Sequence, residues 1–170
     1  MNKEPLVVVG DILSHELGLD SSRIFLYNST RELPKDDKLY LVLEIQGRPP
    51  YAVKHEYKVK TINNEQVYCE VTTMNVQETV YVSCVSKDNS ARLRAYEVQL
   101  SMNSDFAIQQ MFKYGFHISQ ISGVTDASAL EASSRLNRYD CQITLLTAYE
   151  KVKPVEYYDT FEKTETKFEA

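Results

Sequence analysis

Three histidines are the residues best suited to proton transfer near neutral pH, and their spacing indicates no catalytic site. His15 falls near the end of a predicted helix, where the helix dipole favours a cation. His55 lies among alternating lysines and tyrosines, and His117 follows a predicted helix end. None belongs to an HExxH, Hx3H or cysteine-paired pattern of the kind that binds zinc. We therefore expect no catalytic residue and no metal ligand in this chain.

The glycines and serines offer no other catalytic or cofactor chemistry. The five glycines are too scattered for a phosphate-binding loop or a nucleophile elbow, and no serine is marked out as a nucleophile. Acidic pairs such as Asp36 and Asp37 fall in polar stretches, where a solvated turn is the simpler interpretation. The sequence predicts a protein that is not an enzyme and needs no cofactor.

The three cysteines, Cys69, Cys84 and Cys141, lie within alternating apolar segments and lack a CxxC spacing. They are predicted to be buried, reduced thiols rather than metal ligands or disulfide partners. No apolar run approaches the roughly 20 residues that a membrane helix needs. The first ten residues lack the flanks of a secretion signal. We expect a soluble protein, made in a reducing cytoplasm, that has no membrane partner.

A formal net charge of −5 argues against stable binding to nucleic acid. The local exception is a lysine- and tyrosine-rich stretch that contains Lys54, His55, Tyr57 and Lys58. Interleaved basic and aromatic residues can form a stacking surface for single-stranded nucleic acid. The alternative is an exposed hairpin arm whose lysines discourage edge-to-edge aggregation. The acidic remainder of the chain favours the hairpin arm.

The first half of the chain predicts one helix followed by β-structure. The helix covers residues 5–17, because Pro5 suits a first helical turn and Gly18 suits a left-handed helix end. Strands are predicted at 23–28, at 38–47 and at 51–62, the last ending in an Asn63–Asn64 turn, and further β-rich sequence runs from 66 to 86. We interpret the middle third of the chain as an antiparallel meander.

Two helices follow in the second half. Asn89 or Ser90 is the expected N-cap of the first, in which Leu93, Tyr96 and Leu100 form the apolar stripe that should cover the sheet. The second helix lies between the capping Ser104 and Gly115, with a stripe made by Ala107, Met111 and Tyr114. Next come a strand at 116–122 and a small-residue loop at 123–134 with room for a helical turn.

A long strand, Arg135 to Glu150, dominates the C-terminal part of the sequence. Apolar and polar residues alternate along it, with Cys141, Ile143 and Leu145 on one face. Its last twelve residues alone would extend about 40 Å at roughly 3.3 Å per residue, twice the length of an ordinary strand. This strand should overrun the core of its own domain, and the overhang needs a partner.

The order of elements predicts an α+β fold: an antiparallel (mixed) β-sheet with helices packed mainly on one face, a long C-terminal strand and an arm. We expect a single domain over residues 1–154 and a C-terminal arm over 155–170. Twelve tyrosines and no tryptophan indicate contact surfaces, since tyrosine combines a large contact area with a polar tip. The candidates for subunit contacts are Tyr139, Tyr149, Val155, Tyr157, Tyr158, Phe161 and Phe168. The arm is expected to dock on a neighbouring subunit or partner, the alternatives being an arm folded back on its own domain or a disordered one.

Several strings, in order along most of the chain, resemble the tail-terminator or neck-terminator proteins of tailed bacteriophages. They are a helix exit and short strand, ELGLDSSRIFLYN, a strand KLYLVLEIQ and a helix end FAIQQMFKYGF. The long strand RYDCQITLLTAYE, opened by Arg138, and the ending YYDTFEK complete the resemblance. It adds Arg138 to the candidates for subunit contacts.

The resemblance implies a structural virion protein that works as a homohexameric ring. Such a ring caps the tail tube, binds tail tube or sheath proteins, and presents a docking face to the head connector in the neck. It is assembled in the host cytoplasm, and DNA passes through its lumen without specific binding, which agrees with the acidic chain. The alternatives are a head-completion or minor tail protein on a similar fold and, from another class, a small α+β ligand-binding or enzyme domain.

Overall fold

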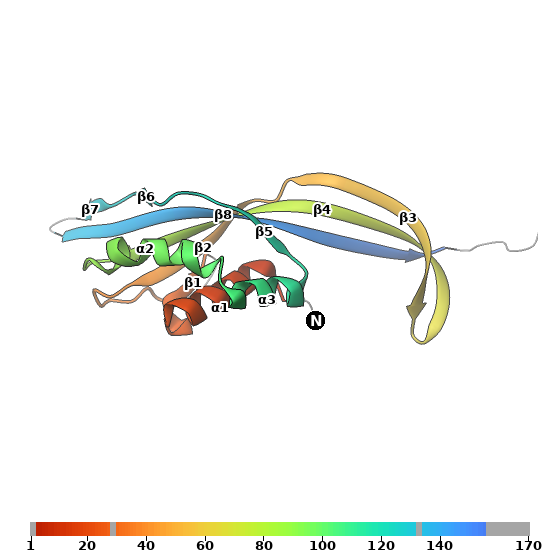
Figure 1. Ribbon diagram of the computed structural model, residues 1–170, viewed down its shortest axis with the longest axis horizontal. Helices are drawn as coiled ribbons and strands as arrows, with labels where there is room; N and C mark the ends of the chain where they lie inside the picture. The colour runs from red at the N-terminus through yellow and green to blue at the C-terminus, as the bar shows by residue number, and fades with distance from the viewer. Residues whose placement is uncertain (1–2, 28–29, 132–133, 156–170) are drawn as a thin grey trace, which may run out of the picture.

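The computed structural model describes residues 3–27, 30–131 and 134–155, and the structural statements below concern those residues. They form three α-helices and a mixed sheet of eight strands (Figure 1). The helices are α1 (Pro5–Leu17), α2 (Ser90–Ser101) and α3 (Asp105–Tyr114). The strands are β1 (Ile24–Leu26), β2 (Tyr40–Gly47), β3 (Pro50–Ile62), β4 (Glu65–Ser86), β5 (His117–Ile121), β6 (Thr125–Asp126), β7 (Ala129–Glu131) and β8 (Ser134–Pro154).

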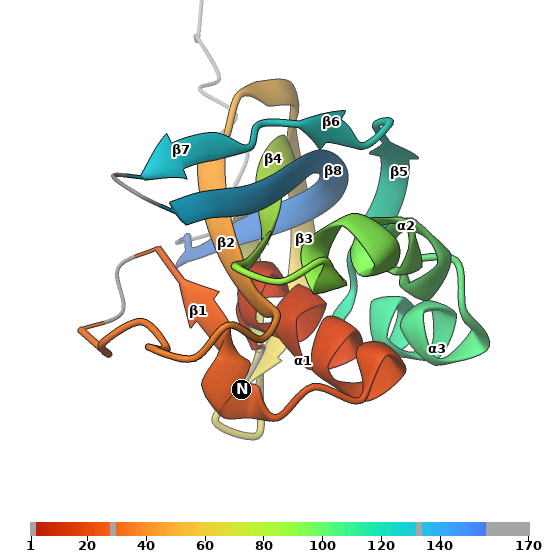
Figure 2. The ribbon, with the colours of Figure 1, turned by 90° about the vertical axis from the view of Figure 1, so that its left-hand side faces the viewer.

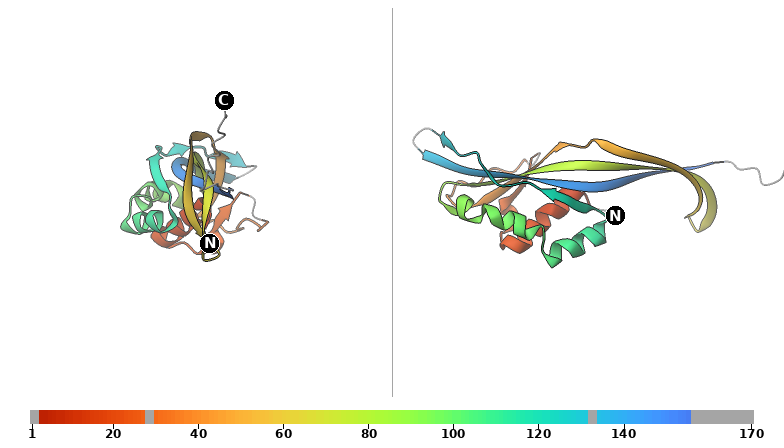
Figure 3. Two further views of the ribbon diagram at one scale, coloured as in Figure 1. Left: turned by 90° about the vertical axis from the view of Figure 1, so that its right-hand side faces the viewer. Right: turned by 45° about the horizontal axis from the view of Figure 1, so that its top comes forward.

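The sheet runs in the order β1-β2-β4-β8-β5, and all its pairs are antiparallel except β1 with β2. Two strands, β4 and β8, are the longest, and they pair with each other from Cys69 opposite Pro154 to Ser86 opposite Asn137. The three helices lie on one side of the sheet (Figures 1 and 3). The predicted α+β fold, with its long C-terminal strand, is therefore confirmed.

Helix α1 is the central helix of the core. Pro5 occupies its first turn, and Gly18 ends it with a positive φ of 61°, a conformation that glycine adopts without steric penalty. The N–H of Leu19 then donates to the carbonyl of Ser14 at 3.0 Å, which closes the helix end. The apolar side of α1 is fully buried through Val8, Val9, Ile12 and Leu13. The predicted helix 5–17 is confirmed.

Helix α2 buries a different stripe from the predicted one. Ala91, Ala95, Val98 and the following Met102 contact the sheet side, and all four are buried. The predicted stripe of Leu93, Tyr96 and Leu100 lies exposed instead. Small residues on the buried side let α2 approach the sheet closely, and the larger apolar residues are left pointing outward.

Helix α3 agrees with its prediction. The Ser104 hydroxyl accepts a hydrogen bond from the N–H of Ala107 at 3.1 Å, and Gly115 ends the helix at a φ of 71°. Ala107 is buried, and Met111 and Tyr114 pack against the same core. In Figure 2, α2 and α3 lie on the side of α1 that is away from β1.

The middle third of the chain is not the predicted meander. Strands β2 and β3 both pair antiparallel with β4, β2 with its second half and β3 with its first half. They therefore run one after the other in the same direction along one edge of β4. The chain continues rather than reverses between Gly47 and Pro50, and the N–H of Gln77 donates to the carbonyl of Pro49 at 3.0 Å across the break. Asn63 and Asn64, both with positive φ, make the tight turn into β4, as predicted.

Strands β6 and β7 occupy the segment predicted as a small-residue loop with a helical turn. Both pair with the first half of β8, beginning with Thr125 opposite Asp140. The described residues 123–131 contain no helical turn. These two short strands lengthen the edge that β5 begins.

The core lies between the helices and the body of the sheet. Its sheet side is formed by alternate residues of three strands, listed as Leu41, Leu43, Val80, Val82, Cys84, Cys141, Ile143 and Leu145. Cys69, Cys84 and Cys141 are all free and buried, as the sequence predicts. Burial raises the pKa of the Cys141 thiol to about 12 and also raises that of Cys84.

Beyond this core, the sheet continues as a narrow three-stranded extension. Figure 1 shows β3 and parts of β4 and β8 leaving the helix-covered body together, with the tip of the β3–β4 hairpin bent toward the side of the helices. We call residues 50–76 and 147–154 the β-extension. Its length follows from β4, whose 22 residues would span about 70 Å at roughly 3.3 Å each.

Candidate assembly surface

One face of the β-extension carries a group of apolar side chains that no other described element covers. Val53 lies opposite Met74, and Met74 lies opposite Tyr149, so the three side chains share one face of the sheet. Because side chains alternate along a strand, Tyr57 and Val59 share it too. We call Val53, Tyr57, Val59, Met74 and Tyr149 the sheet patch; all five are exposed. On β8 the same face continues through Thr147 and Leu145 into the core, so the sheet patch prolongs the face that the helices cover in the body.

The opposite face of β3 is charged. Glu56 accepts from Lys54 at 2.5 Å and from Lys58 at 2.6 Å, and these two contacts lower the pKa of its carboxyl to about 2. Lys60 pairs with Glu150 of β8 at 2.6 Å. Each of these three lysines has a carboxylate partner, and Lys54 and Lys58 share the carboxylate of Glu56. A basic track for nucleic acid would need unpaired cations.

The two other predicted residues of the exposed arm also contact their own hairpin. The His55 Nδ1 lies 3.0 Å from the Thr72 hydroxyl oxygen on the neighbouring strand. The Tyr57 ring stacks on Tyr68 with 6.0 Å between centroids and an angle of 13° between planes. Tyr57 still leaves most of its surface exposed. The hairpin is thus ordered by its own cross-strand pairs while its apolar side chains remain available to a partner.

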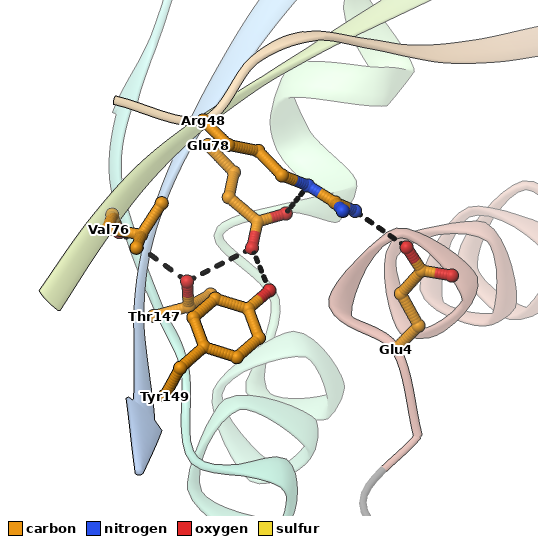
Figure 4. A network of polar contacts seen from close by, with 6 residues as sticks. All are labelled: Glu4, Arg48, Val76, Glu78, Thr147 and Tyr149. Atoms are coloured by element: carbon orange, nitrogen blue, oxygen red, sulfur yellow. Dashed lines mark hydrogen bonds and ion pairs between the residues drawn. The ribbon is translucent and has the colours of Figure 1, made fainter. Parts of the chain in front are cut away.

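A buried carboxylate stands where the β-extension leaves the body (Figure 4). Glu78 of β4 is fully buried, and its Oε1 accepts from the Thr147 hydroxyl at 3.0 Å and from the Tyr149 hydroxyl at 2.5 Å. Its Oε2 lies 3.3 Å from Nε of Arg48, and Nη2 of the same arginine donates to Glu4 at 2.6 Å. The network therefore ties together the β2–β3 break, β4, β8 and the residue before α1.

The electrostatics of this network follow from burial and from its carboxylates. Burial, followed by the hydrogen bond to Glu78, raises the pKa of the Tyr149 hydroxyl. The hydrogen bond to Glu4 raises the pKa of the Arg48 guanidinium, with Glu78 adding to the effect. Because both pKa values are raised, Tyr149 and Arg48 stay protonated beside Glu78. A buried charge is stable only when it is paired in this way, so the network fixes the root of the β-extension.

The structure separates the predicted contact residues into two places along β8. Arg138 is exposed at the body end and pairs with Asp140 at 2.9 Å, and the neighbouring Tyr139 is half-buried and donates to Asp126 at 3.2 Å. Tyr149 belongs to the β-extension and contacts Glu78. The N–H of Val155 donates to the carbonyl of Tyr68 at 3.1 Å, which extends the pairing with β4 by one residue. The remaining candidates, Tyr157, Tyr158, Phe161 and Phe168, lie outside the described residues.

A second exposed apolar surface was not predicted from the sequence. Leu93, Tyr96 and Leu100 on α2 are 63–75% exposed, and on α3 Phe112 is 85% and Ile108 is 41% exposed. We call these five residues the helix patch. The signal was present in the sequence, because α2 contains two apolar stripes and only one can face the sheet. Glu78 was not predicted either, although a lone acid within the alternating run Val76, Val80, Val82 marks a buried charge.

Other kinds of site find no support in the described part of the chain. Among its residues, no group of three or more His, Cys, Asp and Glu side chains is placed to hold a metal ion. None of the helices seen there is long and apolar enough to cross a membrane. The surfaces that stand out are the β-extension and the helix patch, and both are suited to contact with protein.

Comparison with known proteins gives one family. The model of the phage neck terminator proteins matches residues 7–170, nearly the whole chain. No curated protein matches the sequence. The matched region contains the long strands, the β-extension and both apolar patches. The chain therefore belongs to the phage neck terminator protein family, a family of structural proteins of the phage tail and neck.

Proposed function

We propose that the protein assembles as a homohexameric ring that caps the tail tube in the neck and joins it to the head connector. The observation that carries this proposal is the β-extension, which leaves the body with apolar side chains on one face that no other described element covers. A monomer has no use for a three-stranded ribbon that reaches beyond its own core, because the ribbon exposes both apolar side chains and backbone polar groups. In a ring, a neighbouring subunit can cover these side chains and pair with these backbone groups.

The edges of the β-extension support contact by strand addition. Among the described residues, β3 pairs with β4 alone, so its outer edge is open along Pro50–Ile62. On β8, the pairing with β5 reaches only to Leu146, opposite His117, and no other described strand pairs with the outer edge of β8 beyond it. Open edges are templates for pairing with another chain. The described part of each subunit thus brings two open edges, which suits a repeating head-to-tail contact.

The C-terminal arm, residues 155–170, is the second proposed contact element. Val155 starts at the far end of the β-extension, so the arm begins at the point of the described chain where a neighbour is most easily reached. In this proposal residues 1–154 form the domain, and the aromatic residues Tyr157, Tyr158, Phe161 and Phe168 contact a neighbouring subunit or a tail protein. Arg138 and Tyr139, at the body end of β8, are proposed to face a neighbour there.

The lumen needs no site for nucleic acid. A net charge of −5 and the paired lysines of β3 favour passage of DNA without retention. The partners proposed besides the subunit itself are tail tube or sheath proteins on one face of the ring and head-connector proteins on the other.

Native mass spectrometry over a concentration series, with negative-stain images of the most concentrated sample, tests the ring. Six-subunit rings with a central hole are the expected result. If the protein is monomeric, it is incubated with purified tail tubes, and labelled protein at one end of each tube is expected. A monomer that also ignores tail tubes contradicts the proposal.

A truncated chain tests the arm. Deletion of residues 155–170 is expected to leave the melting temperature of the monomer unchanged and to weaken assembly. A large loss of melting temperature would show that the arm belongs to the core.

A further inference from the structure

The two uncovered apolar surfaces of this chain are of complementary kinds. The helix patch is on the sides of α2 and α3 that do not face the sheet. The sheet patch is on a part of the sheet that none of the described helices covers. In the body, the chain joins the same two kinds of surface to make its core, where Ala95 and Val98 of α2 lie over the sheet that contains Val82 and Ile143. Helix-on-sheet packing is one of the few stable ways to bury both.

The helix patch is too exposed to be explained as the margin of the core. Phe112 is 85%, Leu93 75% and Leu100 72% exposed, while the residues between them on the other side of α2 are buried. Single exposed apolar residues are ordinary on protein surfaces, but five on consecutive helices mark a contact surface. Tyr96 and Phe112 alone, at about 150–250 Å² each, expose on the order of 300 Å² of the roughly 800 Å² that one side of a stable interface buries.

The sheet patch is the natural counterpart of this surface. Its five residues are uncharged, and they share their face with the polar or charged residues His55, Glu70, Lys151 and Lys153. This face of the sheet is the one that receives helices in the body. Within the described residues, all three α-helices already lie over the body, so none of them covers the sheet patch. Figure 1 shows the tip of the β3–β4 hairpin bent toward the side of the molecule on which the helices lie.

We propose that the helix patch of one copy packs against the sheet patch of a second copy. This inference rests on the proposed ring and names the two surfaces of its repeated contact. The patches lie at different places on the same chain, so the contact is head-to-tail, and its repetition closes a ring when the rotation between copies permits. Strand addition and helix packing then act on different parts of the β-extension, its edges and its helix-side face.

Photo-crosslinking between isotopically distinct copies tests the contact. A photoreactive phenylalanine derivative replaces Tyr96 in the full chain, and unlabelled and nitrogen-15-labelled protein are mixed before assembly. Irradiation is performed on the assembled species, either rings in solution or rings on purified tail tubes. The matched control places the same derivative at Tyr27, which is equally exposed, at 65%, and lies outside both patches.

The expected result is a crosslink from position 96 to residues 51–59, to Met74 or to Tyr149 of a differently labelled copy, and none of these from position 27. Rings that form while position 96 crosslinks elsewhere, for example to α2 of another copy, overturn this inference and leave the proposed function intact. Failure to assemble both in solution and on tail tubes overturns the ring and this contact together.

Substitutions give an independent measurement. Tyr96→Ser removes an aromatic residue from the helix patch and is expected to raise the protein concentration needed for assembly by about 10-fold or more. Tyr57→Ser in the sheet patch is expected to act in the same direction, and Tyr27→Ser should leave assembly unchanged. All three side chains are mostly exposed in the subunit, so the fold should be retained. Assembly of Tyr96→Ser at wild-type concentrations would contradict the contact.

Discussion

Replacing Glu78 by alanine is expected to destabilise the protein more than any other single loss of a charge described above. The substitution leaves the hydroxyls of Thr147 and Tyr149 without their shared acceptor and removes the ion-pair partner of Arg48. A hydrogen bond to a charged group contributes about 1.5–3 kcal/mol. The sum is reduced because Tyr149 is 42% exposed and the Arg48 side chain 45%, so both regain contacts with water.

The remaining loss falls on the buried part of the network. Thr147 keeps a weaker contact at 3.4 Å to the carbonyl of Val76, and the truncated side chain leaves a cavity between β4 and β8. We expect a loss of about 3 kcal/mol in the free energy of unfolding. For a chain of this size, where 1 kcal/mol shifts the midpoint by about 2–4 °C, the melting temperature should fall by about 6–12 °C.

Thermal unfolding followed by circular dichroism measures this effect, with Glu56→Ala as the matched control. Glu56 also has two cationic partners, but they lie on an exposed face, and solvent replaces them. A midpoint for Glu78→Ala within 1 °C of the control would refute the reasoning. Arg48→Met/Glu78→Leu supplies a second check. Because both charges leave together, it should be more stable than Arg48→Met, which strands a buried carboxylate.

Three further predictions concern protonation and helix ends. Burial holds the Cys84 and Cys141 thiols protonated, since it raises both pKa values; neither should react with a thiol reagent at pH 8 until the protein is unfolded, as measured by absorbance with and without denaturant. The pKa of Glu56 is lower in the folded than in the unfolded chain, so its stabilising contribution is present above about pH 4.5 and is lost as the pH falls toward 2. The acid-induced drop in melting temperature should therefore be smaller in Glu56→Gln than in the wild type. Gly115→Ala is expected to lower the stability by about 1 kcal/mol in denaturant titrations, through the positive φ alone, because a Cβ there would meet no atom within 4 Å.

Local signals in the sequence predicted the elements whose formation depends on neighbouring residues. Pro5 and Gly18 delimit α1, Ser104 and Gly115 delimit α3, and the alternation around Ile143 marks β8. Each of these features acts within a few residues, so periodicity and capping rules were sufficient.

The errors share a different cause, because each depends on what lies beside a segment in space. Two stripes compete on α2, and the distance between helix and sheet selected Ala91 and Ala95 over the larger Leu93 and Leu100. The Gly47–Pro50 break was interpreted as a reversal, although an antiparallel β4 can accept two consecutive strands along the same edge. The partners of Glu78 come from the break between β2 and β3 and from β8, about 30 and 70 residues away, so no local pattern specifies them.

The continuity of β4 and β8 gives the protein a mechanical property. Both backbones run without interruption from the core to the β-extension. Beside them, β2 and β3 follow one another along β4 and are separated by a break at Arg48 and Pro49. The β-extension is thus a cantilever: a sideways load on its tip becomes tension and compression along two strands, and these carry it directly into the core. Bending should concentrate at the break, where the ion pairs of Arg48 resist it. A force on the tip of the β-extension should therefore be transmitted to the core of the subunit and should not be absorbed by a flexible hinge.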